Sequence, residues 1–355
     1  MTTAFDPIDI GSVRLANRIV MAPMTRSRAT APEGLPTALT AEYYAQRASA
    51  GLIITEGIQP SVVGQGYPFT PGLHSQAQVD AWRVVTDAVH AKGGRIFAQL
   101  MHAGRVGHPV LLPEGQVPVG PSAVAATGQV FTPEGLKDFV TPHALTGEEI
   151  RQTIADFATA ARNAVAAGFD GIELHGTTGY LIHQFLAPNS NQRTDEWGGS
   201  VENRIRFAVE TVKAVVAEIG AERTAIRIGA VPFNDISEPE AEPTYLALVA
   251  ELNTFGLAYL HFQEDADREL MQLVRKEFTG PFFLNPRTVD RPTGQEDLHL
   301  IEDGTADVLT FGAGFLANPD LPARLAAGGP YNEADRATFY GGDAKGYTDY
   351  PTLAG

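Results

Sequence analysis

The chain of 355 residues contains no cysteine, which excludes disulfides, thiolate metal sites and cysteine nucleophiles. It also lacks any apolar run approaching the ~20 residues that a membrane-spanning helix needs. Residues 1–18 show no basic segment followed by an apolar one, so no signal peptide is expected. These absences predict a cytoplasmic globular protein.

Basic residues are few, because 26 Lys and Arg stand against 42 Asp and Glu and leave a formal net charge of −16. Nucleic acid and anionic membranes recruit basic patches, so neither is an expected partner. We expect a small molecule to be the partner instead. The composition favours neither a monomer nor an oligomer.

Short apolar runs recur along the chain, with longer amphipathic stretches between them. The runs are nearly continuous rather than alternating, which is typical of strands buried on both faces of a parallel sheet. The predicted strands are residues 18–22, 52–56, 95–100, 171–175, 224–228, 259–263, 281–285 and 307–312.

Helical spacing fills the gaps between these runs. Ser75 with Gln78, and Thr146 with Glu149, form capping-box signatures at two helix starts. The predicted helices are residues 75–93, 146–168, 201–220, 243–256, 266–278 and a short 296–302. Alternating strands and helices predict one (β/α)8 TIM-barrel domain over residues 1–355, with an open doubly wound sheet as the competing architecture.

Two segments stand outside this repeat. Residues 8–15 predict a β-hairpin around Gly11-Ser12, positioned to plug the bottom of the barrel. Residues 106–141 follow the third strand and are rich in Pro and Gly. An insertion of that length in a compact domain is usually a lid or a binding loop, and we expect a lid.

Polar side chains stand at the carboxyl ends of the predicted strands, where barrels place their active sites. An amide, two imidazoles, a phenol and a guanidinium predict a planar ligand rich in oxygen and nitrogen. They do not predict a metal site, and no H-E-x-x-H motif is present. The residues are Thr25, Gln99, His102, His175, Tyr180 and Arg227.

A glycine-rich stretch, GAGFLA, begins at Gly312 directly after the last predicted strand. It matches the G-x-G-x-x-A dinucleotide pattern but lies too near the C-terminus to open a dinucleotide-binding unit. After the eighth strand of a barrel, we expect it to cradle a phosphate instead.

Several stretches together resemble the Old Yellow Enzyme family, whose members are FMN-dependent ene reductases built on a (β/α)8 barrel. The resemblance runs nearly end to end, and residues 173–204 carry its most specific part. The stretches are MAPMTRSR (21–28), GYPFTPGLHSQAQVDAWR (66–83), QLMHAGR (99–105), ELHGTTGYLIHQFLAPNSNQRTDEWGGSVENR (173–204), ANPDL (317–321) and GYTDYP (346–351).

The resemblance implies roles for the residues at the strand ends. Thr25, Gln99 and Arg227 should contact the flavin ring, with Arg227 near its N1–O2 edge. His175 should donate to the oxygen of an activated alkene, and Tyr180 should protonate the substrate. NADPH or NADH would be the hydride donor.

Further positions match the family without a place in this chemistry. Tyr67 and Tyr347 should line the substrate pocket, while His102 and His183 should be structural.

The substrate end departs from the family pattern within HGTTGY (175–180). Thr178 stands where relatives carry a histidine or asparagine that grips the substrate oxygen together with the preceding histidine. Its shorter side chain is expected to weaken that grip by roughly 1–3 kcal/mol. Met101 stands where a tryptophan is common and His143 where an arginine is common, and both are expected to line the substrate pocket.

The phosphate end departs further. Asn285-Pro286 replaces glycines after the seventh strand, and Ala313 replaces the arginine of an FGR motif. Pro286 has no N–H to donate, and Ala313 has no charge. Arg287 is the candidate substitute cation.

Three functions therefore remain open. The first is an FMN-dependent ene reductase with weakened FMN binding, favoured by Arg227. The second is a flavin-free enzyme that uses His175 and Tyr180 as acid and base for an isomerisation or cyclisation. The third is a non-catalytic small-molecule binder, which Tyr180 disfavours.

Overall fold

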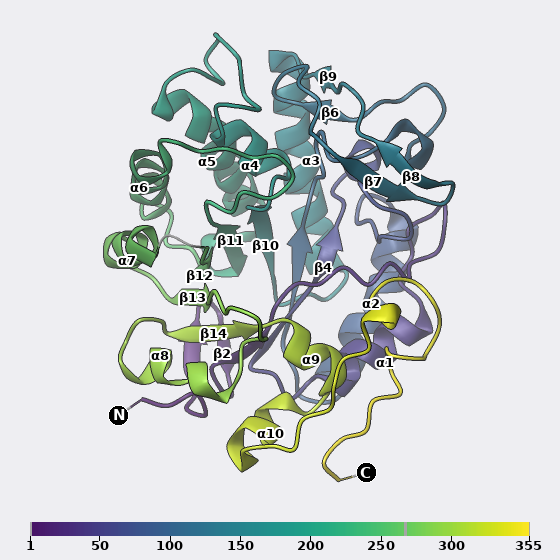
Figure 1. The fold of residues 1–355 in the computed structure, drawn as a ribbon, viewed down its shortest axis with the longest axis vertical. Helices are drawn as coiled ribbons and strands as arrows, with labels where there is room; N and C mark the ends of the chain where they lie inside the picture. Colours follow the sequence, from purple (N-terminus) through teal and green to yellow (C-terminus); the bar gives the residue numbers. More distant parts are fainter. Residues whose placement is uncertain (1, 266–267, 355) are drawn as a thin grey trace.

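A computed structural model describes residues 2–265 and 268–354 of the chain. Within it, eight parallel strands close into a barrel surrounded by helices (Figure 1). In chain order they are β3 (Ile19–Met21), β4 (Leu52–Ile58), β5 (Ile96–Leu100), β10 (Gly171–Gly176), β11 (Thr224–Ile228), β12 (Tyr259–Gln263), β13 (Phe282–Asn285) and β14 (Val308–Phe311).

The closure of the sheet decides between the two predicted architectures. The last strand pairs in parallel with the first, placing Leu309 beside Ile19 and Phe311 beside Met21. The TIM barrel is confirmed, and the open doubly wound sheet is wrong. The eight predicted strands are all present, because runs buried on both faces leave little ambiguity about their position.

Helices cover the outside of the barrel. Both capping boxes are formed, at Ser75 for α2 and at Thr146 for α3. The helix predicted at 266–278 is described from residue 268, and its first two residues lie outside the described part of the chain. The helices are α1 (Ala38–Gln46), α2 (Gln76–His90), α3 (Gly147–Ala166), α4 (Leu181–Leu186), α5 (Val201–Ile219), α6 (Ala241–Leu252), α7 (Arg268–Glu277), α8 (His299–Glu302), α9 (Ala313–Ala317) and α10 (Leu321–Ala327).

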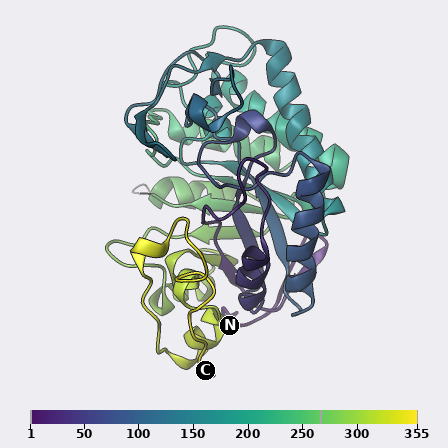
Figure 2. The same cartoon turned by 90° about the vertical axis from the view of Figure 1, so that its right-hand side faces the viewer.

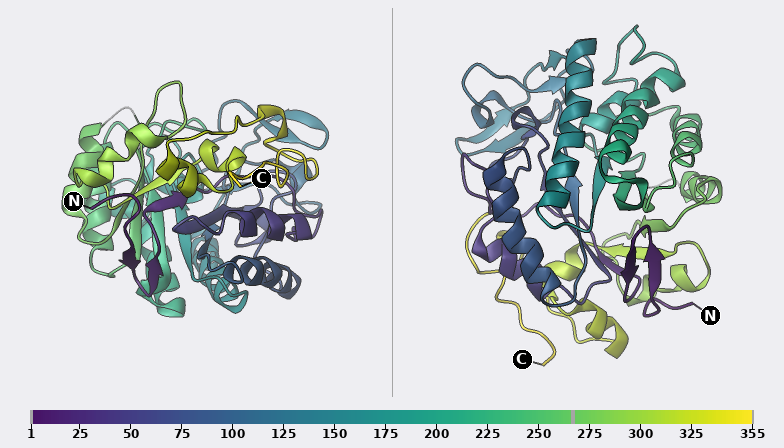
Figure 3. Two further views of the ribbon diagram at one scale, coloured as in Figure 1. Left: turned by 90° about the horizontal axis from the view of Figure 1, so that it is seen from below. Right: turned by 180° about the vertical axis from the view of Figure 1, so that it is seen from behind.

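The predicted N-terminal hairpin is formed by β1 (Ile8–Ile10) and β2 (Val13–Leu15), paired antiparallel. Its apolar side chains pack against lumen residues of the strands. The hairpin itself lies near the N-terminus, at the lower end of the barrel (Figure 3). Gly11 at its turn has φ of +50°, and a Cβ there would lie 2.0 Å from the Glu222 carbonyl oxygen. The turn therefore requires glycine.

The insertion after β5 contains four short strands. β6 (Val119–Gly120) pairs with β9 (His143–Ala144), and β7 (Gln129–Thr132) pairs with β8 (Gly135–Asp138) as a hairpin. This segment lies on the side of the barrel toward which β4 and β10 point (Figure 1). That is the side of the mouth, which a lid requires, and the lid role itself stays a prediction.

The C-terminal segment after α10 runs beside the final barrel units (Figure 2). It returns to the loop after β3, where the Gly341 N–H donates to the Arg26 carbonyl at 2.9 Å. Arg26 in turn donates from Nε to the Phe339 carbonyl at 2.9 Å. Residues from the two ends of the chain thus build one wall of the barrel mouth.

Candidate active site at the mouth of the barrel

The barrel lumen has an apolar lower layer and a polar upper layer. Side chains alternate between the lumen and the helices along each strand, so inward positions recur every second residue. Val20, Phe97, Tyr259 and Phe283 are inward-facing and pack in the lower layer with the hairpin. The polar inward positions of the upper layer are Gln99 on β5, Glu173 and His175 on β10, Arg227 on β11, His261 on β12, Asn285 on β13 and Thr310 on β14.

Glu173 is the centre of a buried hydrogen-bond network. Its Oε1 accepts from Gln99 Nε2 at 2.8 Å, and its Oε2 accepts from the Tyr259 hydroxyl at 3.1 Å. His261 Nδ1 lies 2.9 Å from the same Oε2, while His261 Nε2 lies 3.1 Å from Thr310 Oγ1. Burial alone would raise the pKa of Glu173, but His261, Arg227 and Gln99 outweigh it and lower the pKa. Glu173 is therefore an ionised carboxylate at the floor of the site.

Sequence reasoning missed Glu173 and His261. The signal was present in their position, since Glu173 lies two residues before His175 on the same strand and so shares its inward face.

Arg227 lies beside this network. One of its terminal nitrogens, Nη2, donates to Asn285 Oδ1 at 2.8 Å. Its Nε is buried and has no hydrogen-bond partner within the described residues. Burial lowers the pKa of Arg227, and the charge of Glu173 opposes that shift. The guanidinium remains a cation with an unused N–H, which suits the oxygen or nitrogen of a bound ring.

His175 and Thr178 converge at the mouth. His175 Nε2 lies 2.9 Å from Thr178 Oγ1, so the threonine hydroxyl does come within reach of the imidazole. Burial, followed by the charge of Arg227, holds the pKa of His175 well below its usual range. The imidazole is therefore neutral at pH 7.

Thr178 adopts a left-handed backbone conformation with φ of +51°. This conformation is unfavourable for a β-branched residue. Its carbonyl accepts from Asn234 Nδ2 at 2.9 Å, which helps to hold it. Strain of this kind is often found at functional sites.

The two threonines of HGTTGY have different tasks. Thr177 is fully buried, and its hydroxyl donates to the Gly229 carbonyl at 2.7 Å, tying the loop to the residue after β11. Thr178 instead presents its hydroxyl to the site.

Tyr180 and Tyr67 face each other across the mouth. Their hydroxyl oxygens are 3.0 Å apart, and their rings make an edge contact with centroids 6.3 Å apart. Burial raises the pKa of both phenols, that of Tyr180 well above its usual range. Both are protonated at pH 7, so Tyr180 holds a proton that it can donate.

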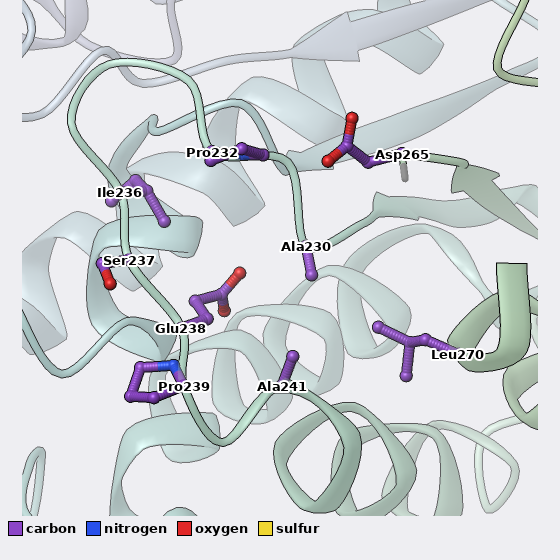
Figure 4. A pocket seen from close by; sticks show the side chains of 9 residues that line it. All are labelled: Ala230, Pro232, Ile236, Ser237, Glu238, Pro239, Ala241, Asp265 and Leu270. Atoms are coloured by element: carbon purple, nitrogen blue, oxygen red, sulfur yellow. The ribbon is translucent and has the colours of Figure 1, made fainter. Parts of the chain in front are cut away.

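The buried His183 supports the loop of residues 175–180 through a hydrogen bond to Gly179. His183 Nδ1 accepts from the Gly179 N–H at 2.9 Å, which leaves Nε2–H to donate to Glu238 Oε2 at 2.7 Å. Tyr245 donates to the same oxygen at 3.2 Å. Glu238 also lines a cavity of about 360 Å³ beside the loop between β11 and α6 (Figure 4). His183 thus has the structural role that was predicted for it.

His102 is also structural in its contacts. Its Nδ1 accepts from the Gly104 N–H at 3.0 Å, and burial lowers its pKa to about 3.

A second cavity, of about 380 Å³, opens where the loops after β3 and β14 meet the C-terminal segment. Thr25, Gly312 and Ala313 line it, together with Tyr340. Arg287, in the loop after β13, is exposed. Its side chain makes no hydrogen bond or ion pair within residues 2–265 and 268–354.

Two tyrosines of the C-terminal segment lie differently. Tyr347 is fully buried and stacked on Tyr43 with ring centroids 4.1 Å apart, and its assignment to the substrate pocket stays a prediction. The exposed Tyr340, seven residues earlier, lines the mouth, and its charge contributes to the raised pKa of Tyr180. Both belong to a Tyr- and Gly-rich segment, and the sequence pattern does not distinguish them.

His143 is exposed, and its Nε2 lies 2.9 Å from Glu149 Oε2 at the start of α3. Its assignment to the substrate pocket stays a prediction.

Met101 directly follows β5 and is buried. It packs so closely on Gly57 of β4 that a Cβ there would lie 2.7 Å from its sulfur.

Two absences among the described residues bear on other functions. None of the described helices combines the length and apolar character needed to cross a bilayer. No cluster of three or more His, Cys, Asp or Glu side chains suited to a metal ion is found within residues 2–265 and 268–354.

A closed (β/α)8 barrel with a polar upper lumen and proton-holding groups at its mouth defines an enzyme of the TIM-barrel class, with its active site at the carboxyl ends of the strands. The chain belongs to the NADH:flavin oxidoreductase / NADH oxidase family, whose model matches residues 3–332. It is 43% identical to 12-oxophytodienoate reductase 1 of Oryza sativa subsp. japonica, covering 98% of this chain and 92% of that protein.

Two further proteins resemble this chain over nearly its whole length. A probable flavin mononucleotide-dependent alkene reductase of Leishmania infantum is 43% identical, with 98% of this chain and 96% of that protein covered. Morphinone reductase in complex with tetrahydroNAD superposes with a TM-score of 0.94 at 43% identity, covering 99% of this chain and 98% of that one.

These findings narrow the three functions left open. The family consists of oxidoreductases with FMN as cofactor and NAD(P)H as reductant, so the non-catalytic binder is wrong. The relatives give no support to a flavin-free isomerase or cyclase.

The residues present fit one end of FMN better than the other. At the ring end, the unpartnered Nε of Arg227 and the Gln99 amide suit the polar edge of an isoalloxazine. His175 Nδ1 is likewise buried without a partner among the described residues. At the phosphate end, neither Ala313 nor Pro286 carries a charge, and Pro286 also has no N–H to donate.

Proposed function

We propose that the chain is an ene reductase that reduces an activated C=C bond, in an α,β-unsaturated carbonyl or a nitroalkene, with NAD(P)H. The observation that carries this proposal is the pairing at the mouth of a neutral His175 with a protonated Tyr180 above a cationic Arg227. The names of the relatives, alkene reductase and 12-oxophytodienoate reductase, are consistent with it.

Arg227, Gln99 and Thr25 would hold the ring of FMN. FMN held there and reduced by NAD(P)H would supply the hydride that the alkene receives. Arg227 places positive charge at the lumen floor, where it stabilises negative charge on a reduced ring.

His175 and Thr178 would hold the carbonyl or nitro oxygen of the substrate. Because His175 is neutral, it stabilises developing charge on that oxygen by donating a hydrogen bond rather than a proton. The Thr178 hydroxyl now bonded to His175 would turn toward the oxygen and add a second donor.

Tyr180 holds the proton that completes the reduction. Its phenol lies against Tyr67, whose hydroxyl at 3.0 Å positions it and can replenish the proton. Because its pKa is raised, Tyr180 keeps this proton until carbanion character develops at the adjacent carbon.

The test is the consumption of NADPH or NADH in the presence of an enone, with the saturated product measured directly. Tyr180→Phe should lower the rate of alkene reduction by about 10²–10⁴-fold, the usual contribution of a general acid. Reduction of the flavin by NAD(P)H should be unchanged, because it needs no proton from Tyr180.

Tyr67→Phe is the matched control, since it removes a hydroxyl from the same pair without removing the donor. We expect it to reduce the rate by only about tenfold. A flavin-loaded protein that oxidises NAD(P)H but leaves enones and nitroalkenes untouched would contradict the proposal.

A further inference from the structure

The loops that follow β13 and β14 form the part of a (β/α)8 barrel that commonly holds phosphate, together with a short extra helix. Here that helix is α9, which has only five residues. The charged and polar groups of these loops decide whether the chain can grip the phosphate of FMN. Most of them are already engaged within the protein.

The loop after β13 offers few donors. Pro286 has no N–H. The N–H of Arg287 donates to Glu264 Oε2 at 3.0 Å. Asn285 uses its side-chain oxygen to accept from Arg227. A buried carboxylate therefore occupies the backbone donor here, and Arg268 Nη1 lies 3.5 Å from its other oxygen.

The loop after β14 offers no charge. Ala313 is exposed and lines the cavity of about 380 Å³. The first residue of α9 therefore presents a methyl group, rather than a cation, to this cavity.

Among the described residues, Arg26 is the one cation lining that cavity, and it is committed elsewhere. Its guanidinium is buried and donates to the carbonyls of Phe339 and Gly346. The same group lies over the rings of Tyr43 and Tyr347, 5.0 and 4.9 Å from their centroids. One nitrogen, Nη1, is buried with no hydrogen-bond partner in the described part of the chain, while the other nitrogens hold the guanidinium against these carbonyls.

The ring end is built differently, with Glu173, Gln99 and Arg227 held by buried hydrogen bonds at the centre of the lumen. We infer that this chain recognises its flavin through the isoalloxazine ring and accepts riboflavin, the dephosphorylated flavin, almost as well as FMN. This inference rests on the proposed function, because it concerns the cofactor of that same site.

The experiment compares the two flavins on the full-length protein. Protein saturated with FMN or with riboflavin is diluted into flavin-free buffer, and the recovery of free-flavin fluorescence gives the dissociation constants. We expect the two constants to agree within about tenfold. Raising NaCl from about 0.05 to about 0.5 M should change FMN binding little, because no exposed ion pair is screened. FMN binding tighter by more than about 100-fold would overturn the inference.

Two variants locate the cause. Ala313→Arg adds a cation at the cavity and should tighten FMN binding by about 10- to 100-fold while leaving riboflavin unchanged. Ala313→Gln is the control for size without charge and should tighten neither flavin appreciably.

Arg287→Ala tests the exposed arginine as a phosphate ligand. We expect the ratio of the two dissociation constants to stay the same. A selective loss of FMN binding by about tenfold or more would show that Arg287 grips the phosphate and would overturn the inference.

Alkene reduction is measured on both loaded forms to separate this inference from the proposed function. If both flavins bind alike but neither form reduces an enone or a nitroalkene, the inference stands and the proposed function fails. If FMN alone binds and supports reduction, the function stands and the inference fails. Failure of both flavins to bind would overturn both.

Discussion

The two ends of the cofactor site are built on different principles. At the ring end, Gln99, Glu173 and His261 project from neighbouring strands and are joined by hydrogen bonds inside the lumen. Arg227 lies beside them and donates to Asn285. At the phosphate end, Pro286 and Ala313 sit in loops after strands and contribute no charge. The same barrel thus keeps a dense polar network at one end, whereas at the proposed phosphate end Ala313 supplies no charge and Pro286 no N–H.

The difference follows from the kind of structure that carries each end, because the ring end lies on strands and the phosphate end lies in loops. The inward positions of a strand are set by its two-residue period, and a buried polar group there is stable only when it is paired. Replacing one member leaves the others unsatisfied. Loop residues tolerate change at little cost to stability, so a phosphate contact can be lost without unfolding the barrel.

Glu173→Ala should break the ring end and have the largest effect. It leaves Gln99, Tyr259 and His261 without their shared acceptor, which should cost about 3–5 kcal/mol of unfolding free energy. FMN and riboflavin binding should weaken together. Glu173→Gln keeps an acceptor and should retain the fold with a smaller loss. Thermal unfolding and flavin fluorescence measure the two effects.

Glu264→Ala is the matched change at the phosphate end, since it removes another buried carboxylate. It frees the Arg287 N–H and removes a negative charge, so FMN binding should tighten by about threefold to tenfold. Riboflavin binding should stay constant. Equal losses for both flavins would show that Glu264 supports the ring instead.

An intermediate effect is expected from Glu238, which accepts a hydrogen bond from His183 and so supports the loop of residues 175–180. Glu238→Ala leaves the Nε2–H of His183 without its acceptor and should loosen the loop through Gly179. We expect kcat for alkene reduction to fall by about tenfold to 100-fold with little change in flavin reduction by NAD(P)H. Glu238→Gln retains an acceptor and should recover most of the loss. Equal losses in both variants would show that the negative charge matters rather than the hydrogen bond.

The strands were predictable because each is a continuous apolar run with a strand-like length. Helices α2 and α3 were predictable from their capping boxes and periodic apolar faces. Helix α1 was not predicted, because its buried face consists of Thr40, Ala41 and two tyrosines rather than aliphatic residues. Short helices such as α9 carry too few residues for any period to be recognised.

The site was predictable only in part. His175, Tyr180 and Arg227 were found at strand ends, and the structure brings them to one mouth. Whether Tyr340 or Tyr347 faces the pocket depends on how the C-terminal segment folds back onto the loop after β3, which no local pattern encodes. The pairing of His143 with Glu149 likewise depends on the path of the insertion.

Thr178→Asn should have a modest effect, and it should stabilise the protein rather than destabilise it. Asparagine tolerates the left-handed conformation that Thr178 adopts at φ +51°, so the free energy of unfolding should rise by about 0.5–1 kcal/mol. Its carboxamide also reaches further, and KM for an enone should fall by about threefold to tenfold. Thr178→Ser, which keeps the hydroxyl without the β-branch, isolates the contribution of strain. A destabilised Thr178→Asn variant would show that the Thr178 backbone is held without strain.

The smallest expected effect is that of pH on alkene reduction. The pKa of His175 is depressed well below its usual range, so this group gains a proton only well below pH 6.5. The pKa of Tyr180 is raised, so this group loses its proton only well above pH 10. Neither group changes state between these limits, and the rate of flavin reoxidation by an enone should vary by less than about threefold from about pH 6.5 to about pH 9. Single-turnover kinetics of the prereduced enzyme measure this step alone. A rate that falls steeply below about pH 7 would mean that His175 titrates near its ordinary value, and that the burial responsible for its neutrality at the ring end is relieved when substrate enters.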